Sequence, residues 1–460
     1  MADQSNHAIY RVIVFRTDGS EVLLTHSHSK AQFPEVSIPQ GRRVAECITS
    51  AMEGIWDEEV ICLFEHVSSH GESKYRHIAT RQARARAAPS ESLYWAPVAD
   101  LVDHSFTDPS DYRALTESVA QCRATIRDTK QRPFARLNWF EEVCEWVEQA
   151  ISSRALHLTG RFRQMNASLE FSLIRFETTG HGVWFKAVGE QNKREFAITL
   201  HLTQFFPEYA PAVLASRADW SAWLSREIEG SSLAEALDLS QWKHAAESLA
   251  KLQIQSIETC DRLLHAGAHD LRLETLLSDV APFMDLATTL MEEQSKTPPP
   301  ILSSADLKVV EWRICDALSR LSQLDIPDTL GNVDLNPRNV FGSTNGCTFL
   351  DWAEAIVGHP FFSFQYLLEH FRHSGIADAQ SEADLTSSYL APWRRITSSE
   401  TLSEAVALVP LVAPFAYASG TAGESADFKD PKLAGYLRAL TRRMKREADQ
   451  LTERMLCLMS

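Results

Sequence analysis

Two carboxylates and a carboxamide stand close together in one segment of the sequence, residues 330–362, which reads LGNVDLNPRNVFGSTNGCTFLDWAEAIVGHPFF. Asn339 follows Asp334 by five residues, and Asp351 follows it by seventeen. The stretch between Asn339 and Asp351 has the pattern of a strand, a turn at STNG and a second strand, which would return Asp351 toward the loop that carries Asp334. Oxygen ligands of these types suit Mg²⁺, and one carboxylate would remain to orient or deprotonate a hydroxyl.

Farther upstream, a single lysine interrupts an apolar strand pattern. Lys186 lies in GVWFKAVG, and Glu195 follows nine residues later, near the start of the helical pattern REFAITLHLTQFF. An ammonium group on such a strand loses much of its hydration, so it needs a partner. We therefore expect Lys186 to pair with Glu195, although a carboxylate in the first turn of a helix is also favoured by the helix dipole alone.

The motifs DLNPRN and LDWAEA, the latter followed by GHP, resemble those of the aminoglycoside phosphotransferase and choline kinase-like family. That family has a protein-kinase-like fold, and the resemblance covers residues 155–460. It implies that Asp334 accepts or orients the proton of the acceptor hydroxyl, while Asn339 and Asp351 hold the metal ion that bridges the nucleotide phosphates. The family's histidine two residues before the aspartate is Asn332 here, which we interpret as a tuning change because an amide can make part of the same hydrogen bonds.

The same resemblance implies where a nucleotide binds. Its contacts would come from Lys186, Glu195, Asn166, Ser168, Glu227 and Ile228. The first two are the strand lysine and the helix glutamate of a kinase-like site. The next two lie in the loop RQMNASLE and would offer donors to phosphate, although an ordinary hairpin turn fits that sequence equally well. The last two lie in REIEGSSL, whose main chain would read adenine as a hinge between lobes.

The N-terminal part contains YRVIVFRTDGSEVLL, IPQGRRVAECITSAMEGIWDEEVICLF and LYWAPVADL, which together resemble a Nudix-type α/β domain. The diphosphate-hydrolysing motif of that family is degenerate here. Aligning Glu46 with its first glutamate places Glu58 and Glu59 at its closing pair, but Gly54 and Ile55 stand where its arginine and central glutamate belong. We interpret the three glutamates as a solvated helix face rather than a magnesium site. The domain would then recognise a ligand or pack on the kinase-like lobes.

The chain is long enough for two or three domains, and its patterns divide it into four parts. Residues 1–125 form the degenerate Nudix-like domain, and residues 126–154 form a charged linker followed by a helix. Residues 155–230 are rich in strands and form the N-lobe, and residues 231–460 are mostly helical and form the C-lobe with the catalytic loop. The expected fold class is α+β: a bilobal protein-kinase-like fold, with a β-rich N-lobe and a helical C-lobe, preceded by a small Nudix-like α/β domain.

Composition argues against several classes of protein. The net charge of −16 is unfavourable for nucleic-acid binding. No uninterrupted apolar run approaches the roughly 20 residues of a membrane span, and the N-terminus lacks the pattern of a secretory signal. Eight cysteines without CxxC spacing favour a reducing, cytoplasmic location over a disulfide framework or a zinc site. The arginines in the extended segment before residue 90 are expected to lie on a solvated strand face; they are Arg76, Arg81, Arg84 and Arg86.

These observations predict an ATP-dependent phosphotransferase that moves the γ-phosphate to a hydroxyl of a small molecule, with Mg²⁺ as cofactor, ATP as co-substrate and GTP left open. Its partners would be the nucleotide and an unidentified hydroxylated molecule, with neither nucleic acid nor membrane. If the acceptor is cationic, Glu354 and Glu369 are candidate contacts, although a surface role fits both. One alternative is a nucleotide-binding pseudokinase or regulatory module, prompted by Asn332 and by the degenerate Nudix motif. A second is Nudix-type diphosphate hydrolase activity in the N-terminal domain.

Overall fold

A computed structural model describes residues 7–27, 30–66, 75–84, 92–125, 133–295, 297–343, 346–424 and 430–459 of the chain. It divides into two compact units. The first comprises Met1–Phe196 and Ala212–Glu227, and the second comprises Ala197–Pro211 and Ile228–Ser460. The last crossing of the chain between units, after Glu227, lies near the lobe boundary at residue 230 that the sequence predicts.

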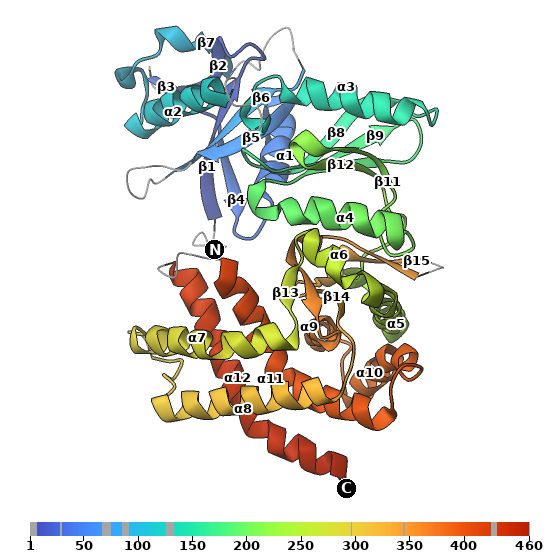
Figure 1. Ribbon diagram of the computed structural model, residues 1–460. Helices are drawn as coiled ribbons and strands as arrows, with labels where there is room; N and C mark the ends of the chain where they lie inside the picture. The colour runs from blue at the N-terminus through green and yellow to red at the C-terminus, as the bar shows by residue number, and fades with distance from the viewer. Residues whose placement is uncertain are drawn as a thin grey trace. The chain divides into compact units, whose positions relative to one another are not determined.

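The N-terminal part of the first unit is a mixed seven-stranded sheet (Figure 1). Its strands are β1 (His7–Phe15), β2 (Glu21–Ser27), β3 (Lys30–Gln32), β4 (Glu35–Pro39), β5 (Val60–His66), β6 (Arg76–Gln82) and β7 (Leu93–Pro97). β1 lies at the centre, parallel to β6 and antiparallel to β2 and β4. Because successive side chains point to opposite faces, Val12 and Val14 pack with helix α1 (Val44–Trp56), whereas Ile13 and Phe15 pack in the layer that contains helix α2 (Pro109–Thr125).

A second, antiparallel sheet of five strands follows in the order β11-β12-β10-β9-β8. Its strands are β8 (Leu158–Ala167), β9 (Ser172–Thr178), β10 (Val183–Ala187), β11 (Val213–Arg217) and β12 (Ala222–Arg226). Helix α3 (Trp139–Ser152) precedes it, and helix α4 (Lys193–Phe205) lies between β10 and β11 and passes from the first unit into the second after Phe196. The strand with Lys186, the helix that begins near Glu195 and the helix after the linker, all predicted from the sequence, are confirmed as β10, α4 and α3.

One hydrophobic core joins the two sheets of the first unit. Phe15 of the first sheet, Trp139 of α3, and Phe176 and Phe185 of the second sheet belong to the same buried cluster. The apolar face of α3 belongs to it as well, through residues at helical spacing: Phe140, Val143, Val147 and Ile151. The predicted N-terminal domain, linker helix and N-lobe therefore form one compact unit rather than separate bodies.

Polar contacts reinforce this junction. The side chain of Gln164 in β8 is fully buried, accepts a hydrogen bond from the Cys62 N–H at 2.7 Å and donates one to the Cys62 carbonyl at 3.0 Å. These contacts satisfy the main chain of β5 next to an irregularity in its pairing with β6. Arg163, the neighbouring residue in β8, pairs with Glu46 in the first turn of α1.

The second unit is mostly helical (Figure 1). Its helices include α5 (Leu239–Ser256), α6 (Cys260–His265), α7 (Leu273–Glu292), α8 (Ser304–Gln323), α9 (Phe361–Arg372), α10 (Ala379–Trp393), α11 (Ser399–Glu424) and α12 (Pro431–Met459). A three-stranded sheet orders β13 (His269–Leu271), β17 (Ala355–Gly358) and β14 (Thr329–Asn332), and β15 (Val340–Ser343) pairs with β16 (Gly346–Phe349) in a hairpin. The hairpin predicted around STNG is therefore confirmed on both sides of its turn.

One helix of the second unit, among the residues described, is long and apolar enough to cross a membrane by length and composition alone. This stretch is Ser399–Gly420 of α11, and 72% of its 18-residue apolar window is buried. Leu408, Val412 and Phe415 have no exposed surface and belong to the core of the unit. Such burial is that of a core helix in a folded unit.

Candidate active site

The three residues predicted to form a catalytic loop lie together in the second unit. Asp334 follows β14, Asn339 precedes β15 directly, and Asp351 follows β16. The N–H of Leu350 donates to the carbonyl of Asn339 at 2.8 Å, which ties the two ends of the hairpin. Since β14 pairs with β17 just beyond Asp351, the chain that leaves the hairpin returns beside the strand that enters the loop.

Asn332, the last residue of β14, connects the two carboxylate segments. Its side chain is buried, its Oδ1 accepts from the Asp334 N–H at 2.8 Å, and its Nδ2 donates to the Asp351 carbonyl at 2.9 Å. Its own N–H donates to the hydroxyl of Ser363 at 2.8 Å. An amide and a neutral imidazole each carry one donor side and one acceptor side, so asparagine can make this bridge where the resembling family has histidine.

Replacing Asn332 by alanine is expected to lower kcat about 30-fold, because two hydrogen bonds that fix the main chain at Asp334 and Asp351 are lost. Asn332→His should keep more of the activity than Asn332→Ala, since imidazole retains a donor and an acceptor. Steady-state rates of ADP release measure both variants. An alanine variant with the wild-type kcat would contradict a scaffolding role.

Asn339 and Asp351 are placed to hold a divalent cation. The Nδ2 of Asn339 lies 3.4 Å from Oδ2 of Asp351, and Asp351 is exposed with a left-handed backbone at φ +62°. A carboxylate and an amide oxygen are ligands that Mg²⁺ accepts, so these two residues fit the ion. Among the described residues, no three His, Cys, Asp or Glu side chains gather as a metal site. The other ligands of Mg²⁺ would then be phosphate oxygens and water, as is usual for this ion.

In the first unit, Lys186 and Glu195 form the expected ion pair, with Nζ 2.5 Å from Oε1. Strand alternation sends Val183 and Phe185 of β10 into the core and leaves Lys186 on the opposite face, where its side chain is 16% exposed. Glu195, in the first turn of α4, is 2% exposed. A charge so well buried needs its partner, so the pair holds the ammonium group in one place.

The loop that precedes β9 is closed mainly by its own residues. The hydroxyl of Ser168 accepts from the N–H groups of Glu170 at 3.3 Å and Phe171 at 3.0 Å, and the Ser168 N–H donates to the Phe171 carbonyl at 2.8 Å. Asn166 lies inside β8, opposite Leu173 of β9. This is the geometry of a hairpin turn. A phosphate contact from Ser168 would use its hydroxyl hydrogen, and the role of Asn166 and Ser168 in nucleotide binding stays a prediction.

Glu227 ends the first unit and Ile228 begins the second. The N–H of Glu227 donates to the Gly182 carbonyl at 2.9 Å, and its carboxylate accepts from Arg175 at 2.5 and 2.8 Å. These hydrogen bonds from Arg175 lower the pKa of Glu227. The role of the main chain at Glu227 and Ile228 in reading adenine also stays a prediction.

On the acceptor side, Glu369 of α9 is already paired. Both of its carboxylate oxygens accept from the guanidinium of Arg443 in α12. This pairing neutralises the charge on Glu369, so we withdraw it as a contact for a cationic acceptor. Sequence reasoning also missed Tyr366, whose hydroxyl donates to Oδ1 of Asp334 at 2.7 Å. Its only sequence signal is that it follows the GHP motif by six residues in a helical pattern.

The three glutamates of the Nudix-like motif do not share a site. Glu46 pairs with Arg163, Glu58 accepts from Gln82 at 3.1 Å, and Glu59 lies 3.2 Å from Arg84. The interpretation as one solvated helix face is wrong, because α1 ends at Trp56 and Glu58 is buried. Of the four arginines assigned to a solvated strand face, Arg81 is fully buried against Glu141 at 2.7 Å, and Arg86 lies outside the described residues.

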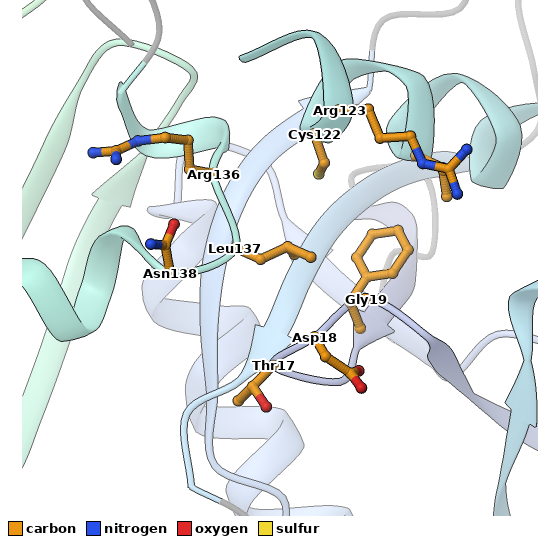
Figure 2. A pocket seen from close by; sticks show the side chains of 10 residues that line it. Thr17, Asp18, Gly19, Cys122, Arg123, Arg136, Leu137 and Asn138 are labelled. Atoms are coloured by element: carbon orange, nitrogen blue, oxygen red, sulfur yellow. The ribbon is translucent and has the colours of Figure 1, made fainter. Parts of the chain in front are cut away.

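A cavity of about 540 Å³ in the first unit contains none of the predicted site residues (Figure 2). Its wall includes the turn after β1, with Asp18 and Gly19, and the segment from Arg136 to Asn138 that leads into α3. The charge of Arg136 is already compensated, since its guanidinium donates to Glu142 at 2.8 Å and to the Pro133 carbonyl at 3.2 Å. Arg136 therefore contributes little uncompensated positive charge to the cavity.

No protein-family model matches the chain, and no curated protein sequence matches it either. Solved structures that match include phosphotransferases and kinases of small molecules. A macrolide 2'-phosphotransferase from Brachybacterium faecium is 14% identical with a TM-score of 0.45, and the match covers 66% of this chain and 98% of that one. A choline kinase from Cryptosporidium parvum is 12% identical with a TM-score of 0.47, over 68% of this chain and 96% of that one. An ethanolamine kinase from Plasmodium vivax is 14% identical with a TM-score of 0.43, and the match covers 65% of this chain and 85% of that one. At these identities and TM-scores, any activity of this chain has to be inferred from its own residues.

Proposed function

We propose that this protein is a small-molecule kinase that transfers the γ-phosphate of ATP to a hydroxyl group, with Mg²⁺ as cofactor. The observation that carries the proposal is the loop in which one buried side chain, Asn332, joins the main chain at Asp334 to the main chain at Asp351, beside Asn339. A base for a hydroxyl and two oxygen ligands for a cation are the parts that phosphoryl transfer needs.

Each residue then has a separate task. Asp334 orients the acceptor hydroxyl and takes its proton as the acceptor oxygen bonds to the γ-phosphorus and the bond from that phosphorus to ADP, the leaving group, breaks. Asn339 and Asp351 supply the protein ligands for Mg²⁺, which when bound would neutralise charge on the phosphate oxygens. Lys186, oriented by Glu195, supplies a fixed positive charge for the same phosphates.

Lys186→Gln is expected to lower kcat/KM for ATP about a hundredfold, because a preorganised charge on the phosphates is lost. Glutamine can still donate a hydrogen bond to Glu195, so the buried carboxylate keeps a partner. The matched control is Lys193→Gln, which removes an exposed lysine of the same unit and should leave the kinetics within about twofold. A Lys186→Gln enzyme within threefold of wild type would contradict the phosphate role.

The test of the proposed function is a screen for Mg²⁺-dependent ADP release over a panel of hydroxylated metabolites, with each hit confirmed by mass of the phosphorylated product. ATP and GTP are compared at equal concentration. Binding of nucleotide without transfer to any acceptor would instead favour a pseudokinase or regulatory module. The acceptor class stays open, with Glu354 as the candidate contact for a cationic molecule.

We also propose a reducing, cytoplasmic location. The proposal is supported by the cysteines that the structure describes, which are all free thiols: Cys47, Cys62, Cys122, Cys144, Cys260, Cys315 and Cys347. Burial raises the pKa of Cys62, Cys122 and Cys347, as expected of thiols that take no part in exchange.

A further inference from the structure

Helix α9 touches the catalytic strand and loop at two points. Ser363 accepts from the Asn332 N–H at 2.8 Å, and Tyr366 donates to Oδ1 of Asp334 at 2.7 Å. Ser363 and Tyr366 are three residues apart and lie on one side of α9. Asn332 ends β14, and Asp334 lies in the turn that follows it. One face of α9 therefore contacts both the end of the strand and the turn.

The ring of Tyr366 is held from two sides. The Tyr417 ring lies edge-on to it at 5.6 Å between centroids, and the His370 ring, one turn along α9, lies at 5.0 Å. Tyr417 is itself fixed, because it is buried and its hydroxyl donates to the Phe362 carbonyl at 2.7 Å. Tyr366 is only partly exposed, so its hydroxyl has little freedom to leave Asp334.

In the hydrogen bond between Tyr366 and Asp334, the donor is the group that keeps the proton. Burial, and then the hydrogen bond to Asp334, raises the pKa of Tyr366 above its ordinary value. The phenol therefore remains protonated throughout the physiological range and acts as the donor. With Oδ1 of Asp334 engaged by Tyr366, Oδ2 is the oxygen left to accept a hydrogen bond from an incoming hydroxyl.

We infer that Tyr366 is a positioning residue that fixes the Asp334 carboxylate so that a single oxygen, Oδ2, receives the acceptor hydroxyl. The inference rests on the proposed function, since it assigns a task within that reaction. A freely rotating carboxylate would present either oxygen at varied angles. Fixing one oxygen in advance raises the fraction of bound complexes in which the acceptor is aligned for attack.

Tyr366→Phe keeps the ring and removes only the hydroxyl. Loss of a hydrogen bond to a charged group is expected to lower kcat about 10- to 100-fold. The KM for ATP and the nucleotide dissociation constant should change by less than twofold, because the contact lies on Asp334 and not on the nucleotide. A role in folding alone would instead lower stability and leave kcat per folded molecule unchanged.

The matched control is Tyr389→Phe in the same unit. Tyr389 is fully buried, and its hydroxyl donates to Oε1 of Gln253 at the same distance, 2.7 Å. The substitution deletes a tyrosine hydrogen bond of the same length that does not involve Asp334, so kcat should stay within twofold of wild type. A drop in kcat as large as that of Tyr366→Phe would overturn the inference, because the effect would then follow from any lost tyrosine hydroxyl.

A double-mutant cycle tests the contact without any acceptor. Tyr366→Phe, Asp334→Ala and the double variant are compared by their urea unfolding midpoints, and the shift of the double variant should be smaller than the sum of the single shifts. Additive shifts overturn the inference. An active wild type whose Tyr366→Phe variant keeps its kcat within twofold overturns it as well, leaving the kinase function standing. A wild type that binds ATP but phosphorylates nothing in the screen overturns the proposed function itself, and Tyr366 then has no reaction to serve.

Discussion

Asp334→Asn should lower kcat for phosphoryl transfer by about a thousandfold while the nucleotide dissociation constant stays within about threefold of wild type. Asparagine has the size of aspartate, so the Asp334 N–H can keep its bond to Asn332, and Tyr366 can still donate to a carbonyl oxygen. What disappears is the negative charge that, in the proposed reaction, takes the acceptor's proton. The effect thus belongs to the chemical step, and single-turnover rates together with calorimetric nucleotide binding measure the two parts separately.

Asp351→Asn is expected to give a different result from Asp334→Asn, and the contrast separates the role of a base from that of a metal ligand. Because Asp351 is the proposed protein carboxylate at Mg²⁺, its neutralisation should weaken Mg²⁺-dependent nucleotide binding as well as turnover. If Asp334→Asn weakened Mg·ATP binding as strongly as Asp351→Asn does, the separation into a base and a metal ligand would be wrong.

Asp111→Asn should lower the free energy of unfolding by about 3–5 kcal/mol. Asp111 of α2 has no exposed surface, and its carboxylate pairs with two groups of the sheet, Arg11 and His77, the latter at 2.8 Å. Arg11 is 3% exposed and also contacts Glu35 at 2.9 Å. Removing the central carboxylate leaves Arg11 inside the protein with part of its compensation gone, and a buried charge without its partner is costly. Urea unfolding followed by tryptophan fluorescence measures the loss.

Asp449→Asn is the matched control for that stability change. Asp449 of α12 also pairs with a basic residue, Lys445, at 2.8 Å, but it is 57% exposed. Water screens this pair, so its loss should move the unfolding midpoint very little. Equal effects of the two substitutions would show that burial is not what makes the network around Asp111 matter.

Local patterns explain most of what could be predicted from the sequence. The hairpin before Asp351, the strand with Lys186 and the helix with Glu195 each follow from apolar spacing within about a dozen residues, together with turn residues such as those in STNG. Their pairing in space then follows from chemistry, because a lysine on an apolar strand requires a carboxylate.

Local sequence patterns could not predict contacts between segments that are distant in the chain. Nothing near Arg81 indicates that Glu141, sixty residues later, covers it, and nothing near Glu58 indicates that Gln82 donates to it. Tyr366 reads as one more apolar position of a helix until the fold brings its hydroxyl to Asp334. Single charged or hydroxylated side chains carry no periodicity, so their partners depend on the tertiary structure.

The shared core of the first unit determines how this protein can be taken apart. A cut between residues 125 and 133 looks natural in the sequence, yet it would split a cluster that contains both Phe15 and Phe185 and would leave Gln164 without the strand it satisfies. The chain instead passes from one compact unit to the other three times, after Phe196, after Pro211 and after Glu227. For recombination or domain exchange, the N-terminal sheet and the Lys186 sheet are therefore one exchangeable module, and a transplant that includes Lys186 must carry both.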